Sequence, residues 1–226
     1  MPDMPELKLI IGNRNYSSWS LRAWLAMREA GLTFTEEMVP LDLPETRDRL
    51  LAHSAAGRVP VLYHGDLLVW DTLAIIEYLS ETFPKHPQWP TDARARALAR
   101  SVSAEMHAGF AALRSEIPMN IRASGRQVTL SDAAKADVAR ILELWQSCLD
   151  RRDADGPFLF GRFCAADAMF APIVSRFRTY EIALTPDLQD WSDAVWTTQG
   201  MSWWRAASEQ ESWTIPAEEV GQKSSG

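Results

Sequence analysis

The 226-residue chain is poor in cysteine and lacks several patterns that mark other classes of protein. Its two cysteines, Cys148 and Cys164, do not form the disulfide framework on which small secreted domains depend. No apolar run is long enough to cross a membrane, and the acidic N-terminal segment lacks the pattern of a signal peptide. These absences predict a reducing compartment, and we expect a cytoplasmic protein without a membrane partner.

Positive charge is also scarce, because 23 lysine and arginine residues stand against 30 aspartate and glutamate residues, which gives a net charge of −7. No basic stripe is present that would neutralise a phosphate backbone, so we expect no nucleic-acid partner. The sequence contains no glycine-rich phosphate loop and no catalytic triad. The four histidines lack the spacing of metal ligands, and we therefore expect neither a metal nor a nucleotide cofactor.

The most specific stretch that is present runs over residues 57–63, Gly-Arg-Val-Pro-Val-Leu-Tyr. Pro60 cannot donate a hydrogen bond to a strand ladder, so it belongs at the entry to a strand. A turn and a second short strand over 67–69 follow, and Asp71 and Thr72 then open an apolar-periodic helix. The order of parts is a strand that begins at a proline, a hairpin, and a helix that begins with Asp-Thr.

The N-terminal part predicts a strand, a helix and a second strand. Residues 7–11 indicate a short buried strand, 12–20 a polar loop, 21–30 a helix, and 33–39 a second extended segment. An irregular link then leads to the hairpin. A strand, crossover helix and strand imply a parallel pair with a right-handed connection. We therefore expect an α/β unit over about residues 5–84.

Beyond residue 84 the pattern is helical. Three prolines within residues 84–90 predict a linker. We expect a long helix from 91 to about 117, a second that starts near Ser131, and a third that leads on from Asp167. The tryptophan-rich remainder from residue 185 should pack as short helices over the first unit. Asp167 is expected to hold the start of its helix and to have a structural role.

These parts in this order, together with the Ser-Ser-Trp-Ser run at 17–20, resemble the glutathione S-transferases, and in particular their serine-type, zeta-like and bacterial cytosolic members. The resemblance implies an α/β plus all-α fold, with a thioredoxin-like glutathione-binding domain over 1–84 and a linker over 85–90. An all-helical electrophile-binding domain would cover 91–216, and a disordered tail 217–226.

The resemblance also implies an activity. Such a protein is an enzyme of detoxification that takes reduced glutathione as co-substrate and adds it to a small hydrophobic electrophile, and it is usually a homodimer. Two alternatives stay open. One is a glutathione-dependent cis-trans isomerase of an unsaturated diacid, similar to maleylacetoacetate isomerase. The other is a non-catalytic binding module that has kept the fold.

The resemblance implies a set of glutathione-binding residues. Val59 would offer its backbone to the cysteinyl unit beside a cis Pro60, in a strand-like contact. Asp71 would bind the γ-glutamyl ammonium, and Thr72 with the free amides of the helix start would bind its carboxylate. Arg58 would reach the glycyl carboxylate. Plain helix capping by Asp71 and Thr72 is the simpler alternative.

The thiol of glutathione needs activation, because a free thiol has a pKa of roughly 8.5. A hydroxyl in the loop before the first helix would donate to the thiolate where the positive end of the helix also stabilises it. We expect Ser17 to supply this hydroxyl, with Ser18 next and then Asn15 through its amide. Alternatively, these residues only cap the helix.

The second substrate should meet the thiolate between the two domains. Candidate residues of this electrophile pocket are Tyr16, Met106, Phe110, Arg114 and Met119, although methionine and aromatic residues at helical spacing more often form the core. An acidic substrate would need a basic partner. Arg114, Arg176 and Arg178 are the candidates for it.

Overall fold

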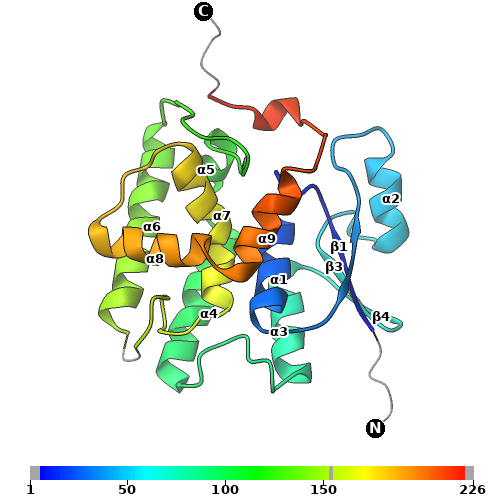
Figure 1. The fold of residues 1–226 in the computed structure, drawn as a ribbon, viewed down its shortest axis with the longest axis horizontal. Coiled ribbons are helices and arrows are strands. Elements are labelled where there is room, and N and C mark those ends of the chain that lie inside the picture. Colours follow the sequence, from blue (N-terminus) through cyan, green and yellow to red (C-terminus); the bar gives the residue numbers. More distant parts are fainter. Residues whose placement is uncertain (1–5, 153–154, 222–226) are drawn as a thin grey trace, which may run out of the picture.

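The computed structural model describes residues 6–152 and 155–221, and its N-terminal half is built on a four-stranded sheet (Figure 1). The sheet order is β2-β1-β3-β4. β1 runs parallel to β2 and antiparallel to β3, and β3 pairs with β4 as a hairpin. The elements of this half are β1 (Leu7–Ile11), α1 (Ser18–Glu29), β2 (Thr35–Met38), α2 (Thr46–His53), β3 (Val61–His64), β4 (Leu67–Val69) and α3 (Thr72–Thr82).

Both faces of the sheet are covered, which explains why β1 is a nearly continuous apolar run. α1 and α3 pack on one face, where Leu9 and Leu62 join the main core. On the other face Leu50 of α2 closes a small second core with Ile10 and Val61. The expected parallel pair, hairpin and thioredoxin-like order are confirmed.

Two boundaries in this half differ from those expected. We predicted an irregular link before the hairpin, but this link contains α2, in which Leu50 is the one buried residue. A helix with so little apolar periodicity gives no clear signal in the sequence. α1 begins at Ser18, three residues before the predicted start. Its first turn is polar yet buried, since Ser18 and Ser20 are both shielded from water.

The C-terminal half is helical, as expected. It contains α4 (Ala93–Ala108), α5 (Ala111–Glu116), α6 (Asp132–Asp150), α7 (Ala165–Thr179), α8 (Pro186–Trp196), α9 (Gln199–Ser208) and the 3₁₀-helix η1 (Pro216–Glu218). The single helix predicted from 91 to about 117 is wrong. The chain breaks at Phe110, which adopts a left-handed conformation with φ of 60° and anchors its ring in the core.

Helix α1 joins the two halves, because it packs against α3, α7 and α9 (Figure 1). Trp24 of α1 stacks on Trp203 with 4.9 Å between ring centroids and contacts Trp204 at 5.1 Å. The prediction therefore holds for α9, which packs on α1 of the first half, whereas α8 packs against α6 and α7 of the helical half. In the helical half, the rings of Trp145 and Trp191 pack with 4.4 Å between their centroids. These tryptophans therefore belong mainly to the core and the domain interface.

The start of α7 is organised around Asp167, which is fully buried. Its carboxylate accepts hydrogen bonds from the backbone N–H of Leu159 at 3.1 Å and of Cys164 at 2.9 Å. The indole N–H of Trp191 is a third donor at 2.9 Å. Asp167 thus ties a loop, a helix start and α8 together, which agrees with a structural role.

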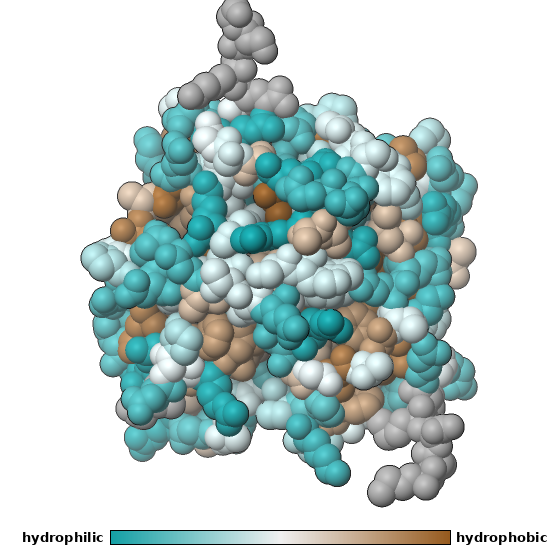
Figure 2. Space-filling view, viewed as in Figure 1, coloured by the Kyte–Doolittle hydropathy of each residue, from teal (hydrophilic) through white to brown (hydrophobic). Residues whose placement is uncertain are grey.

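The surface and the C-terminal end complete the fold. Figure 2 shows a largely polar face on which apolar residues form separate patches. Within the described ranges, no helix combines the length and apolarity that crossing a membrane requires. Part of the tail that we expected to be disordered, residues 217–221, is ordered against the protein, whereas 222–226 lie outside the described residues.

Candidate functional site

A cleft of about 570 Å³ lies between the two halves of the molecule. It receives side chains from the loop before α1, from the segment before β3, from α5, from α7 and from η1. Its lining residues are Tyr16, Ser17, Ser18, Trp19, Leu41, Leu50, Gly57, Arg58, Val59, Ala111, Arg114, Ser115, Arg176 and Glu218. The two motifs singled out in the sequence, around Ser17 and around Val59, therefore meet in one cavity.

Ser17 occupies the N-cap position of α1, yet its side chain makes no capping hydrogen bond. Its hydroxyl instead donates to Ser20 Oγ over 2.7 Å. Ser20 Oγ also accepts the backbone N–H of Gly12 at 3.0 Å. Since either serine hydroxyl can donate, Ser20 can return the hydrogen bond when Ser17 donates to a ligand. The Ser17 hydroxyl thus lies at the positive end of α1 but is not used in a capping hydrogen bond.

Asn15 has a different place. It is fully buried and does not line the cleft. Its amide nitrogen donates to Asn120 Oδ1 at 2.9 Å, and its Oδ1 accepts the backbone N–H of Arg122 at 2.8 Å. The side chain therefore joins the loop before α1 to the helical half, and it is not aimed at a ligand in the cleft.

Of the other loop residues, Ser18 and Tyr16 line the cleft together with Ser17. The Tyr16 hydroxyl donates to Glu219 Oε1 at 2.7 Å and accepts from the Arg122 guanidinium at 3.3 Å. These contacts fasten the C-terminal segment beside the loop. Ser18 shows no side-chain hydrogen bond to the described residues, so its hydroxyl is also available at the cleft.

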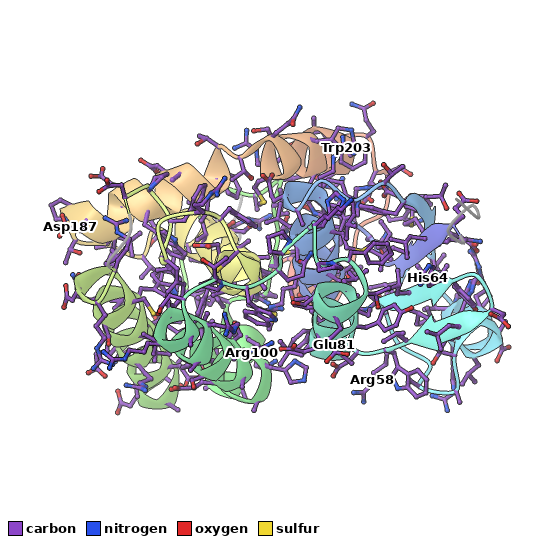
Figure 3. The ribbon with its side chains drawn as sticks, turned by 90° about the horizontal axis from the view of Figure 1, so that it is seen from below. Arg58, His64, Glu81, Arg100, Asp187 and Trp203 are labelled. Carbon is purple, nitrogen blue, oxygen red and sulfur yellow. The ribbon has the colours of Figure 1, made fainter. Side chains whose placement is uncertain are left out.

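The segment before β3 forms the opposite wall. Val59 and Arg58 line the cleft, and the Val59–Pro60 peptide bond is cis, as the resemblance implies. The backbone N–H and C=O of Val59 make no hydrogen bond within the described ranges. Pro60 itself is buried. Arg58 is exposed at the edge of the sheet half (Figure 3).

Asp71 and Thr72 begin α3 near this wall but do not line the cleft itself. Asp71 caps the helix, accepting the backbone N–H of Leu73 at 3.2 Å. Its other oxygen, Oδ2, lies 3.1 Å from Nε2 of His107, a residue of α4. Thr72 is buried, and its hydroxyl donates to the backbone oxygen of Trp19 at 3.3 Å. The cap that Asp71 makes on α3 therefore does not prevent Asp71 and Thr72 from also binding a ligand.

The residues predicted for the electrophile pocket separate into two groups. Arg114 lines the cleft with Tyr16. Met106, Phe110 and Met119 do not line it and are buried in the core of the helical half, the alternative that the sequence left open. A helical stripe of apolar residues does not distinguish a pocket wall from a core, because both need the same spacing.

Positive charge gathers around Trp19. The Arg22 guanidinium lies 4.3 Å from its ring centroid and that of Arg114 lies 5.4 Å away. Arg22 is fully buried, its Nε donates to the Met169 carbonyl, and its two terminal nitrogens have no partner among the described residues. Burial lowers the pKa of Arg22 well below its ordinary value, and the charges of Arg176 and Arg114 lower it further.

Arg176 brings another guanidinium to the cleft. It is almost fully buried, and its Nε donates to the Ile117 carbonyl at 2.9 Å. Burial lowers the pKa of Arg176 to about 10, with Glu218 opposing and Arg114 assisting this shift. Arg178, the third arginine considered for an acidic substrate, pairs with Asp193 and does not line the cleft.

Sequence reasoning missed three residues that shape the site, namely Ser20, His107 as a partner of Asp71, and Glu218. Ser20 belongs to the segment that was predicted as a polar loop, so its spacing from Ser17 was a usable signal. The other two meet the site only through the tertiary fold, because α4 and the C-terminal segment are distant in sequence. Around this site and elsewhere in the described ranges, no group of three or more histidine, cysteine or acidic residues is arranged to hold a metal.

Comparison with known proteins agrees with the geometry. The sequence model of the glutathione S-transferase N-terminal domain matches residues 16–82. The chain is 28% identical to Protein IN2-1 of Zea mays over 192 residues, which cover 80% of this chain and 73% of that protein. It is 39% identical to glutathione S-transferase 1 of Dianthus caryophyllus over 92 residues, which cover 40% and 42% of the two chains. Other relatives are named as zeta-class glutathione S-transferase and probable maleylacetoacetate isomerase.

Among solved structures, the glutathione transferase homolog from Burkholderia GL BGR1, which has bound glutathione, has the same fold. The TM-score is 0.71 at 24% sequence identity, and the match covers 91% of this chain and all of that one. The domain match covers both motifs of the cleft, since Ser17 and Val59 lie within residues 16–82. The chain therefore carries a glutathione S-transferase N-terminal domain over residues 16–82 and has the fold of the glutathione transferases.

Proposed function

We propose that this protein binds reduced glutathione in the cleft and transfers it to a small electrophile, with the Ser17 hydroxyl stabilising the thiolate. One observation carries the proposal, namely that Ser17 sits at the start of α1, lines the cleft and leaves its helix uncapped by its side chain. When bound, glutathione supplies the nucleophilic thiolate. The chain supplies a hydroxyl donor and the positive helix end, both of which favour the charged form of a thiol.

The remaining glutathione contacts follow from the opposite wall. Val59, whose backbone N–H and C=O are unpaired within the described ranges, would bind the cysteinyl unit, and Arg58, which also lines the cleft, would bind the glycyl carboxylate. Asp71 and Thr72, at the start of α3, would hold the γ-glutamyl group. Ser20 acts as a positioning residue, since its hydroxyl keeps Ser17 in place. Holding both reactants in one cleft supplies much of the remaining rate enhancement.

Calorimetric titration with reduced glutathione tests the binding part of this proposal. Saturable binding should weaken in Thr72→Ala and be largely retained in Thr72→Ser, because serine keeps the hydroxyl. Ser17→Ala should leave the affinity nearly intact while raising the pKa of the bound thiol. Absence of binding at millimolar glutathione would contradict the proposal and favour the non-catalytic module.

The second candidate is a glutathione-dependent cis-trans isomerase of an unsaturated diacid. The cleft favours it because Arg114 and Arg176 both line it, and an arginine fork suits a carboxylate. The two functions separate in an assay that supplies neutral electrophiles and unsaturated diacids with catalytic glutathione. Isomerisation without consumption of glutathione would select this candidate, and conjugate formation would select the transferase.

We also propose that the protein is a two-fold symmetric homodimer and that it is located in the cytoplasm. Both proposals follow from the family resemblance. Sedimentation equilibrium of the purified chain would test the dimer.

A further inference from the structure

The C-terminal segment contributes a carboxylate to the cleft. Glu218 of η1 lines it together with Ser17, Arg114 and Arg176. Glu218 makes no salt bridge with any arginine of the described ranges, although it is near enough to Arg176 for their charges to influence each other. Glu218 is therefore a separate negative charge in the cleft, and it lines the cleft together with the positively charged Arg114 and Arg176.

The segment that carries Glu218 is fastened on both sides. The next residue, Glu219, accepts hydrogen bonds from Tyr16, from Asn120 at 2.7 Å and from Arg126 at 2.5 Å. Upstream, the Arg122 guanidinium donates to the Trp213 carbonyl at 2.9 Å. These anchors hold the backbone of Glu218 in place, so its side chain is presented to the cleft by the fold.

We propose that Glu218 sets the charge selectivity of the second-substrate site, by competing with acidic groups of the substrate for the guanidinium groups of Arg114 and Arg176. This inference rests on the proposed function, since it concerns what binds beside glutathione. Without Glu218, the guanidinium groups of Arg114 and Arg176 would attract any anion in the cleft. When Glu218 is ionised, it repels a substrate carboxylate and partly neutralises the arginines that would bind that carboxylate. A neutral substituent is affected by neither interaction.

The selectivity should depend on pH. The charged groups around Glu218 are Arg176 from α7, Arg114 from α5, Arg58 from the segment before β3, and Asp42 from the loop after β2. Burial raises the pKa of Glu218 above its ordinary value of 4.5, with Arg176 opposing and Asp42 adding to the shift. The carboxylate therefore becomes neutral as pH falls through this raised value, and its competition with an acidic ligand is lost.

A matched pair of ligands tests the proposal. S-(carboxymethyl)glutathione and S-(carbamoylmethyl)glutathione have nearly the same shape and differ by one charge, and calorimetry gives the affinity of each. Glu218→Gln should raise the ratio of acid to amide affinity by about fivefold, the effect of one charge interaction at contact in water. In the wild type this ratio should rise as pH is lowered towards the pKa of Glu218, and in Glu218→Gln it should stay flat. Glu209→Gln, an exposed change outside the cleft, is the control and should leave the ratio unchanged.

A ratio that is unchanged or lower in Glu218→Gln would overturn the proposal, as would an equal gain for both ligands, which would mean that Glu218 repels glutathione itself. If neither ligand bound to the wild type, the proposed function would fail and this inference with it. Thermal unfolding of each variant verifies that the comparison is made on folded protein.

Discussion

Replacing Asn15 by alanine separates structural from activating roles in the loop before α1. Asn15 and Ser17 are both polar, and both were candidates for thiol activation. The structure gives Asn15 two side-chain hydrogen bonds to the helical half, to Asn120 and Arg122, and no place in the cleft. The Asn15→Ala change should therefore affect stability and leave the chemistry of the site intact.

The magnitude follows from the groups that lose their partner. Asn120 is buried, so its Oδ1 would bear the cost of an unsatisfied polar group, about 1–3 kcal/mol. The backbone N–H of Arg122 is only partly buried and would lose a bond worth about 1 kcal/mol. The free energy of unfolding should fall by about 2–4 kcal/mol, which lowers Tm by roughly 4–16 °C for a chain of this size.

Differential scanning calorimetry and glutathione titration, both at a temperature where the variant is folded, provide the assay. Asn15→Ala should lower Tm while the affinity for glutathione and the pKa of the bound thiol stay unchanged. Ser17→Ala should give the reverse, with little loss of Tm because Ser20 still accepts the Gly12 N–H. An Asn15→Ala protein with wild-type Tm and an unactivated thiol would refute this reasoning and make Asn15 the activating group.

Three further predictions concern other parts of the structure. His107→Phe should weaken glutathione binding about threefold, because the Asp71 carboxylate loses its contact with His107 Nε2, and an unchanged Kd by calorimetry would contradict this. Cys148 and Cys164 should not react with Ellman's reagent in the native protein at mildly alkaline pH and should react fully in urea. Both are buried, and burial raises the pKa of Cys148 to about 12, so rapid native labelling would contradict the packing. Asp167→Ala should lower the free energy of unfolding by about 3–5 kcal/mol in urea titrations, since three donors lose their acceptor, and a loss within experimental error would contradict its structural role.

Local patterns in the sequence predicted much of the fold. The proline before β3, the hairpin and the Asp-Thr helix start involve neighbouring residues, and the structure has them in the predicted order. The helix α2 was missed because a single buried leucine leaves no periodicity to detect. The break at Phe110 was missed because its left-handed backbone is stabilised by the burial of its ring, which is a tertiary effect.

The site was predictable to the extent that its residues lie in short motifs. Ser17 and Val59 were expected near each other from the order of the motifs, and both line one cleft. Met106 could not be assigned from its spacing, because the same helical stripe fits a pocket and a core. Glu218 was missed altogether, since only the path of the C-terminal segment brings it to the cleft.

The most direct test of the account is the pKa of the glutathione thiol when bound, measured from the ultraviolet absorbance of the thiolate over a pH titration. The wild type should ionise the bound thiol well below the value of roughly 8.5 that a free thiol has. Ser17→Ala should return the pKa towards that value, while Ser18→Ala, a matched serine in the same cleft, should not. A bound thiol that ionises equally in the wild type and in Ser17→Ala would contradict the central claim.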